Sequence, residues 1–145
     1  MAKNKWKTHL NNDVISEVLS LTENHPYYVN ALCRRLWRNN KMPTLSEVRN
    51  GWDNYITQQS VWIIDDLSRL TLNRRKVITA LAYQSTCEPQ GQEFSERAGL
   101  NPSAIKKALT DLNKLDLIYQ DKQGYYHILD PAVAYYIRQH SFKNI

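Results

Sequence analysis

The chain has 145 residues, of which 42% are hydrophobic, and its formal net charge is +5. That length suits one domain of ordinary size or two small ones, and only four glycines and five prolines argue against a disordered or loop-rich chain. No apolar run reaches the roughly 20 residues that cross a bilayer, and the first residues lack the apolar stretch of a signal peptide. We therefore expect a cytoplasmic protein with a packed core.

The positive charge is spread along the chain. Residues 1–60 contain eight Lys or Arg and five Asp or Glu, a net +3, whereas residues 61–145 contain eleven and nine, a net +2. Neither half has the strongly basic composition of a dedicated nucleic-acid-binding module, so charge alone does not assign that function.

The beginning of the chain is predicted to be helical. Apolar residues recur with a 3.6-residue period over residues 14–21, after Asn11 or Asn12 as the capping residue. Asn24 suits the left-handed conformation that ends a helix, and Pro26 suits the first position of the next one. The arginines outside the apolar face of that second helix are interpreted as its solvated face, with a phosphate or acidic partner as the alternative: Arg34, Arg35 and Arg38.

A third helix is predicted from a capping box, in which Glu47 follows Thr44 by three residues. We expect it to continue towards Leu67 with a break near residues 58–60. The first 65 residues thus form a small helical bundle. Three tryptophans at or near its apolar stripes are expected to be largely buried: Trp37, Trp52 and Trp62.

The pattern of predicted elements changes in the second half of the chain. A helix is expected over residues 73–84, followed by a short helix that ends at Gly99 and a longer one capped by Asn101 and begun by Pro102. Two helices joined by a short turn containing Gly are typical of a helix-turn-helix. The residues predicted to form the buried stripe of the longer helix are Ile105, Leu109, Leu112 and Leu115.

A β-hairpin is predicted directly after these helices. The run LIYQDKQGYYHIL places two β-prone segments around a polar loop that ends in Gly124. Tyr125 and Tyr126 are interpreted as alternating core and surface strand residues, with base-stacking groups as the alternative. Pro131 then opens a last helix, whose residues expected to pack on the core are Val133, Tyr136 and Ile137. The predicted fold is mainly α, a helical bundle at residues 1–65 and a winged helix-turn-helix at residues 66–145.

No catalytic constellation is visible, so we do not expect this chain to be an enzyme by itself. The glycines are isolated and form no phosphate-binding loop, and Asp65–Asp66 is interpreted as a solvated helix end. The cysteines, Cys33 and Cys87, are expected to be buried, reduced thiols in apolar helical surroundings. The four histidines lie in separate elements without metal-ligand spacing, so no metal or cofactor is expected: His9, His25, His127 and His140.

The outer face of the helix over residues 102–115 is the candidate DNA-binding surface. The candidates opposite its apolar stripe are Ser103, Lys106, Lys107, Thr110 and Lys114. Such a face can enter a major groove, although Asp111 weakens its positive field and winged helices also act as protein-packing modules. Arg74 and Arg75 could hold phosphates from the preceding helix, or simply form a solvated helix start.

The sequence resembles the C-terminal region of signal-transducing STAND-type P-loop ATPases, relatives of the archaeal ATPases. ENHPYYVNALCRRLW is similar to the "GHPYYVQ…L" motif of their helical lid, with Asn24 in place of Gly. RLTLNRRKVITALA is similar to the "LSxxQRxVLxALA" segment that opens their winged helix. DPAVAYYIR is similar to the closing "DP…YWIR", with Tyr136 in place of Trp. The resemblance spans nearly the whole chain.

This resemblance implies a function for the first bundle as a nucleotide-facing lid. It places His25, Pro26 and Tyr27 on the adenine or ribose side of ATP in a full-length parent, which would also bind magnesium. A proline-started core helix explains the same residues without a ligand. Because no phosphate loop is present, we expect the chain to be a C-terminal piece whose partner is an N-terminal P-loop ATPase domain.

Three functions are therefore open. The first is a regulatory region that relays the nucleotide state of an ATPase domain to double-stranded DNA or to a protein partner. The second is a free-standing winged-helix DNA-binding regulator. The third is a structural protein-interaction module. A phosphate loop encoded in frame upstream would favour the first.

Overall fold

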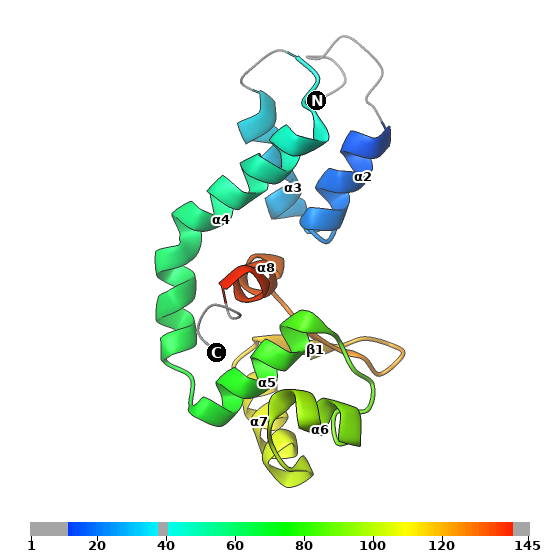
Figure 1. Cartoon of the computed structure of the whole chain (residues 1–145), viewed down its shortest axis with the longest axis vertical. Helices are drawn as coiled ribbons and strands as arrows, with labels where there is room; N and C mark the ends of the chain where they lie inside the picture. The colour runs from blue at the N-terminus through cyan, green and yellow to red at the C-terminus, as the bar shows by residue number, and fades with distance from the viewer. Residues whose placement is uncertain (1–11, 38–40, 141–145) are drawn as a thin grey trace. The chain divides into compact units, whose positions relative to one another are not determined.

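The computed structural model describes residues 12–37 and 41–140, so the predictions for His9, Asn11 and Arg38 lie outside the described residues. Its elements are drawn in Figure 1 and run in the order α2 (Asn12–Leu21), α3 (Pro26–Leu36), α4 (Leu45–Ser68), α5 (Leu72–Tyr83), α6 (Gln92–Ala98), α7 (Pro102–Lys114), β1 (Ile118–Gln120), β2 (Tyr126–Ile128) and α8 (Pro131–His140). The predicted mainly helical fold with a short hairpin is confirmed.

The chain divides into two compact units, Met1–Gln59 and Ser60–Ile145, and α4 runs across the division. The predicted domain boundary after residue 65 stays a prediction.

The turns of the first unit follow the predicted local signals. Asn24 has a left-handed backbone with φ of 60°, as does the preceding Glu23 with φ of 50°. Pro26 occupies the first turn of α3, where its missing N–H leaves no hydrogen bond unmade. The capping box is also present, since the Glu47 amide donates to Thr44 Oγ1 at 3.1 Å and the Thr44 amide donates to Glu47 Oε1 at 3.3 Å.

Aromatic rings form the centre of the first unit. Trp52 of α4 is fully buried, and the ring of Tyr28 from α3 meets it edge-on at 5.5 Å between centroids. Tyr55 stacks on Trp52 at 5.7 Å. The hydroxyl of the buried Thr22 donates to the Val18 carbonyl at 2.7 Å, so this polar group enters the core with its hydrogen bond made.

The predicted break in α4 near residues 58–60 is wrong. The helix is continuous from Leu45 to Ser68, because the segment Gln58–Ser60 contains neither proline nor glycine and every residue can donate to the helical ladder. Thr57 also donates its hydroxyl to the Asp53 carbonyl at 2.9 Å, a bond that keeps this β-branched side chain within the helix.

The predicted burial of the tryptophans is correct for Trp52 and wrong for Trp62. Trp62 is 71% exposed and Trp37 is half-buried. The buried stripe of α4 passes through Ile56 and Ile63. Trp62 lies about 100° around the helix axis from Ile63, so it points away from the stripe.

The second unit contains the predicted helix-turn-helix, formed by α6 and α7. α6 ends at Gly99, whose φ of 68° is the left-handed conformation that favours glycine. Asn101 then caps α7, its side-chain oxygen accepting the Ala104 amide at 2.8 Å, and Pro102 follows in the first turn. These two residues start α7 in the direction that buries its apolar face.

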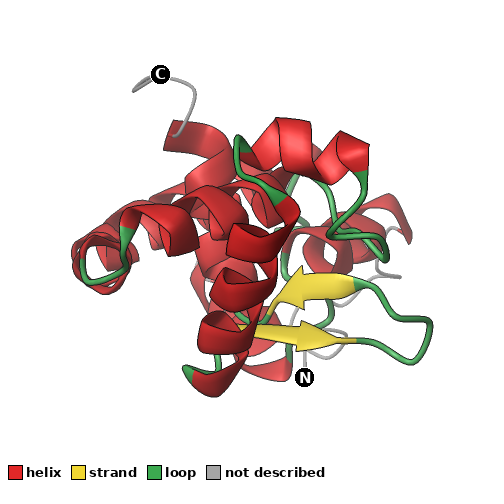
Figure 2. Ribbon diagram, turned by 90° about the horizontal axis from the view of Figure 1, so that it is seen from below, coloured by secondary structure: helices red, strands yellow, loops and turns green. Residues whose placement is uncertain are grey.

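The hairpin after α7 consists of two antiparallel strands (Figure 2). Its register places Tyr119 opposite His127. Its turn closes at Gly124, which has φ of 90°. Thr86, in the connection between α5 and α6, forms an isolated antiparallel bridge with Tyr126 next to the two-stranded sheet. The two tyrosines alternate as predicted, and the structure shows that Tyr126 packs against the core and Tyr125 is exposed.

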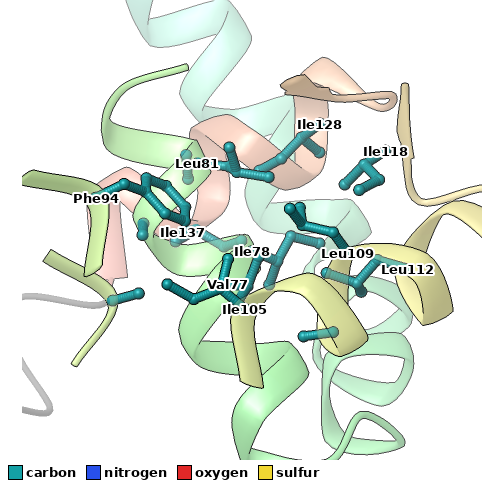
Figure 3. Close-up of a cluster of buried hydrophobic side chains, with 14 of the residues drawn as sticks. Val77, Ile78, Leu81, Phe94, Ile105, Leu109, Leu112, Ile118, Ile128 and Ile137 are labelled. Atoms are coloured by element: carbon teal, nitrogen blue, oxygen red, sulfur yellow. The ribbon is translucent and has the colours of Figure 1, made fainter. Parts of the chain in front are cut away.

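The core of the second unit is mainly aliphatic, and Figure 3 shows side chains from its helices and hairpin meeting around Ile78 and Ile105. The predicted stripe of α7 is correct except for Leu115, which is half exposed. α7 ends at Lys114, and the left-handed Asp116 turns the chain away. The buried residues that α7 contributes are Ile105, Ala108, Leu109 and Leu112.

The last helix packs on the core, and the two cysteines differ in their exposure. In α8, Ile137 is buried and Val133 packs against the core, while the half-buried Tyr136 stacks on His140 at 4.2 Å. The prediction of a buried helical Cys87 is wrong, because α5 ends at Tyr83 and the extended bridge at Thr86 carries the exposed Cys87 into the α5–α6 connection. Cys33 is half-buried in α3.

Candidate nucleic-acid interface

The outer face of α7 presents three exposed lysines, Lys106, Lys107 and Lys114. They lie opposite the buried residues of the helix, so the amphipathic pattern directs their ammonium groups to solvent. No ion pair involves these lysines within the part of the chain that the structure describes. Their charges remain available to an anionic partner.

The two hydroxyl candidates on this face already make local hydrogen bonds. Ser103 donates to the side-chain oxygen of Asn101 at 2.9 Å, and Thr110 donates to the Lys106 carbonyl at 3.0 Å. Both residues are exposed, and their oxygens can still accept hydrogen bonds. Ser103 therefore belongs to the cap of α7 as well as to its outer face.

An ion pair between α5 and α7 changes the expected charge of this surface. Arg74 Nη2 lies 3.0 Å from Asp111 Oδ2, and the two side chains are 29% and 26% exposed. Asp111 is the acidic residue of α7, so the pair neutralises the charge that weakened the predicted DNA-binding face. Because Arg74 is held in this pair, its guanidinium is not free to contact a phosphate. Arg75 remains exposed at the start of α5.

Two open grooves border α7. One has a volume of about 670 Å³ and lies between the first turns of α5 and α7, where Arg74, Asn101 and Lys107 line it. The other, of about 400 Å³, lies between α7 and the hairpin, and its lining residues include Lys106, Lys114, Gln120 and Tyr126. The lysine-bearing face of α7 and the hairpin therefore border one concave surface.

The hairpin turn contains a polar network that the sequence interpretation missed. The Asp121 carboxylate accepts the amides of Gln123 and Tyr125 through Oδ1, each at 2.9 Å, and contacts His127 Nε2 through Oδ2 at 2.7 Å. His127 Nδ1 lies 2.8 Å from the hydroxyl of Ser85. The hydrogen bond from His127, followed by that from the Tyr125 amide, lowers the pKa of Asp121 below its ordinary value.

Part of this network has a sequence signal. An aspartate three residues before a glycine is typical of a turn in which the side chain accepts backbone amides, so the role of Asp121 could have been inferred from DKQG. The contact of His127 with Ser85 joins residues 42 positions apart and has no local signal.

The lid candidates lie in the other unit, where His25, Pro26 and Tyr27 are all exposed at the start of α3. Tyr27 is 65% exposed, and the His25 ring packs on Tyr28 at 4.9 Å. Arg35 of the same helix donates to Gln58 and lies over the Tyr55 ring, whereas Arg34 is exposed. The side chains of this α3 entrance are thus accessible to a ligand or partner.

The described residues offer neither a metal centre nor a membrane span. Across 12–37 and 41–140, no three His, Cys, Asp or Glu side chains gather closely enough to hold a metal ion. Within the same ranges, no helix has the length and apolar character that crossing a bilayer requires.

Comparison with protein-family models gives one match, to a family described as a probable winged helix domain, over residues 64–139. The matched segment is just over half of the chain and contains the helix-turn-helix and the hairpin. The chain belongs to this family. No curated protein and no solved structure matches it.

Membership of this family gives α7 and the hairpin their roles in the winged helix domain. α7 is the second helix of the helix-turn-helix, the position that enters the major groove in DNA-binding relatives of this motif, and the β1–β2 hairpin is the wing. Winged helix domains commonly bind DNA or proteins, so membership leaves the choice of partner to the surface itself. The matched family gives no link to STAND or other P-loop ATPases, and that relationship stays a hypothesis.

Proposed function

We propose that the winged helix domain binds double-stranded DNA through the outer face of α7. The observation that carries the proposal is the set of three exposed lysines on a helix whose acidic residue, Asp111, is held in an ion pair by Arg74. A face with three unpaired ammonium groups and no free carboxylate attracts the phosphate backbone. Thr110 and Ser103 lie beside the lysines, where their oxygens can approach base edges or phosphates.

The expected affinity is modest. Three phosphate contacts correspond to a slope of about −3 when the logarithm of the binding constant is plotted against the logarithm of the salt concentration. Arg75 can add a fourth contact from the start of α5. Binding should therefore be clear at low ionic strength and weak near physiological salt.

The decisive experiment measures duplex DNA binding by fluorescence anisotropy at several salt concentrations. The triple variant Lys106→Ala/Lys107→Ala/Lys114→Ala should lose about tenfold or more in affinity at low salt, together with most of the salt slope. A matched control removes three exposed cations elsewhere, at Arg34, Lys41 and Arg69. It keeps the wild-type affinity if α7 is the interface. Equal losses in both variants would show that only net charge matters.

A protein-interaction module is the second candidate function. Two apolar side chains of α4, Val61 and Trp62, are each 71% exposed. An exposed tryptophan beside another apolar residue is typical of a protein contact. If the wild-type chain shows no shift on duplex DNA even at low salt, this candidate replaces DNA binding. A free-standing winged-helix regulator would bind DNA through the same face of α7, without a P-loop partner.

For the whole protein we propose a STAND-type ATPase in which this chain is the C-terminal regulatory region. Support comes from the HPYY segment at the entrance of α3, where His25, Pro26 and Tyr27 are exposed and so available to a nucleotide held by an N-terminal P-loop domain. ATP and magnesium would then belong to that domain. The chain itself, which has no phosphate-loop sequence, is not an enzyme and should give no micromolar heat of binding with Mg-ATP in calorimetry.

A further inference from the structure

The turn of the wing, the five residues 121–125 between β1 and β2, is held by several hydrogen bonds. The Asp121 amide donates to the Tyr125 carbonyl at 2.9 Å, and the Gly124 amide donates to the Asp121 carbonyl at 3.0 Å. The Asp121 side chain adds two more bonds from inside the turn, and Gln120 Nε2 donates to the Gly124 carbonyl at 3.1 Å. The exposed Lys122 therefore sits on a turn with a defined backbone.

His127 connects this turn to a different part of the domain. A carboxylate oxygen only accepts, so the contact with Asp121 places a proton on His127 Nε2. In the neutral ring Nδ1 then accepts the hydroxyl proton of Ser85, and in the protonated ring Nδ1 donates to the same oxygen. The hydrogen-bonded series Asp121–His127–Ser85 thus persists in both charge states of the histidine.

Ser85 anchors this hydrogen-bonded series because its own segment is fixed to the domain. The neighbouring Thr86 carbonyl accepts the Tyr126 amide at 2.8 Å, and Ser85 follows α5 after only one residue. The ring of Tyr119 from β1 stacks on His127 at 5.1 Å, which restricts its rotation. The wing is consequently attached to the α5–α6 connection by side chains as well as by its strands.

Hydrogen bonds connect Ser85 to His127 and His127 to Asp121, which is the arrangement of a catalytic nucleophile, its base and the residue that orients the base. The surroundings, however, do not support catalysis. The adjacent cavity of about 200 Å³ is lined by Ser85 and by one cation, Arg97. That guanidinium already binds Gln84 and Glu93. Among the described residues of this cavity, no free cation remains to stabilise an oxyanion beside Ser85.

We propose that Asp121, His127 and Ser85 form a positioning device that holds Lys122 where it contacts a DNA phosphate beside α7. This inference rests on the proposed DNA-binding function. The groove between α7 and the hairpin supports it, since Lys106, Lys114 and Gln120 of the wing border one concave surface. A duplex seated on α7 lies next to the wing turn, and a fixed turn loses less conformational entropy when Lys122 binds.

A double-mutant cycle on duplex DNA affinity tests the device. Lys122→Ala should weaken binding roughly fivefold at low salt and reduce the salt slope by about one. His127→Phe keeps a ring that can stack on Tyr119 but removes both hydrogen bonds, and it should weaken binding to a similar extent. The double variant should be no weaker than Lys122→Ala alone. Additive losses would show that His127 does not act through Lys122 and would overturn the proposal.

Ser85 supplies the conservative control. Ser85→Ala should behave like His127→Phe, whereas Ser85→Thr keeps the hydroxyl and should keep the affinity. Hydrogen exchange of the Tyr125 and Gly124 amides provides a readout without DNA, and it should quicken in His127→Phe while the core of α7 stays protected. Unchanged exchange in that variant would also overturn the positioning role.

The outcomes separate this inference from the proposed function. If the wild type binds DNA and the triple lysine variant of α7 does not, but Lys122→Ala binds like the wild type, only the role of the wing is wrong. If the wild type does not bind duplex DNA at all, the proposed function fails, and the wing contact fails with it.

Discussion

Both compact units of the chain bury mainly aliphatic side chains, and they differ in the aromatic rings that pack with them. In the first unit, Trp52 lies at the centre and Tyr28 and Tyr55 pack on its ring. In the winged helix domain the buried cluster is aliphatic apart from Phe94, and it is assembled from every helix after α4 and from both strands. The other buried hydrophobic residues of the first unit are aliphatic, so the difference lies in the cluster of rings around Trp52.

This difference should appear as a difference in robustness. A core in which two further rings pack on one buried tryptophan loses much of its packing when that tryptophan is removed, because the neighbouring rings cannot close a cavity of that size. An aliphatic core that draws on many elements loses only a fraction of its buried area with any single truncation. The winged helix domain should therefore tolerate core substitutions that unfold the first unit.

The largest expected effect is that of Trp52→Ala. Removing this ring should cost the first unit about 3–5 kcal/mol, enough to unfold it while the winged helix domain keeps its helices. Thermal unfolding followed by circular dichroism should then retain one transition, that of the second unit. Trp62→Ala is the matched control, since its exposed side chain contributes little burial and should leave both units folded. A single cooperative loss of all helix would contradict the independence of the units.

The cysteines of the two units differ in their accessibility to solvent. Cys87 of the winged helix domain is exposed, whereas burial raises the pKa of the Cys33 thiol in α3 above its ordinary value. A buried thiol with less thiolate reacts slowly, so iodoacetamide should modify Cys87 before Cys33 reacts appreciably. Mass spectrometry of Cys33→Ser and Cys87→Ser variants assigns the two rates. Labelling of Cys33 as fast as that of Cys87 would contradict the expected order of reactivity.

A smaller effect is expected from the helix caps of the winged helix domain. Asn101 accepts the Ala104 amide, so Asn101→Ala should destabilise the domain by about 1 kcal/mol. Thr71 occupies the corresponding position of α5 without a side-chain cap hydrogen bond, and Thr71→Ala should cost less. Urea unfolding of the two variants measures the difference directly. Equal losses would mean that the Asn101 contact contributes nothing beyond ordinary cap propensity.

The smallest expected effect is the pH dependence contributed by Asp121. Its pKa is lower in the folded protein, so its contribution to stability is present above the unfolded pKa, near 3.8, and is lost as the pH falls through the folded value. The stability difference between the wild type and Asp121→Asn should be constant near neutral pH and shrink in acid. The melting temperatures of both proteins between pH 6 and pH 3 provide the measurement. A difference that grows on acidification would contradict the sign of this shift.

The sequence by itself determined the local parts of the fold. The capping box at Thr44, the turn at Asn24 and the Asn101–Pro102 start of α7 were predicted and are present. These signals lie within one helical turn, where covalent geometry and side-chain hydrogen bonds act without help from the rest of the chain. The order of helices and hairpin followed from the same signals, and the matched family agrees with it.

Only the tertiary structure decided which charges and side chains are available. Arg74 and Asp111 lie 37 positions apart, and nothing near either residue predicts that each neutralises the other. Ser85 and His127 are joined by the bridge between Thr86 and Tyr126, which itself depends on the hairpin packing beside α5. Trp62 is exposed because the buried stripe of α4 passes through Ile63 instead. Such pairings depend on how elements pack, and packing is set by contacts between residues distant in the sequence.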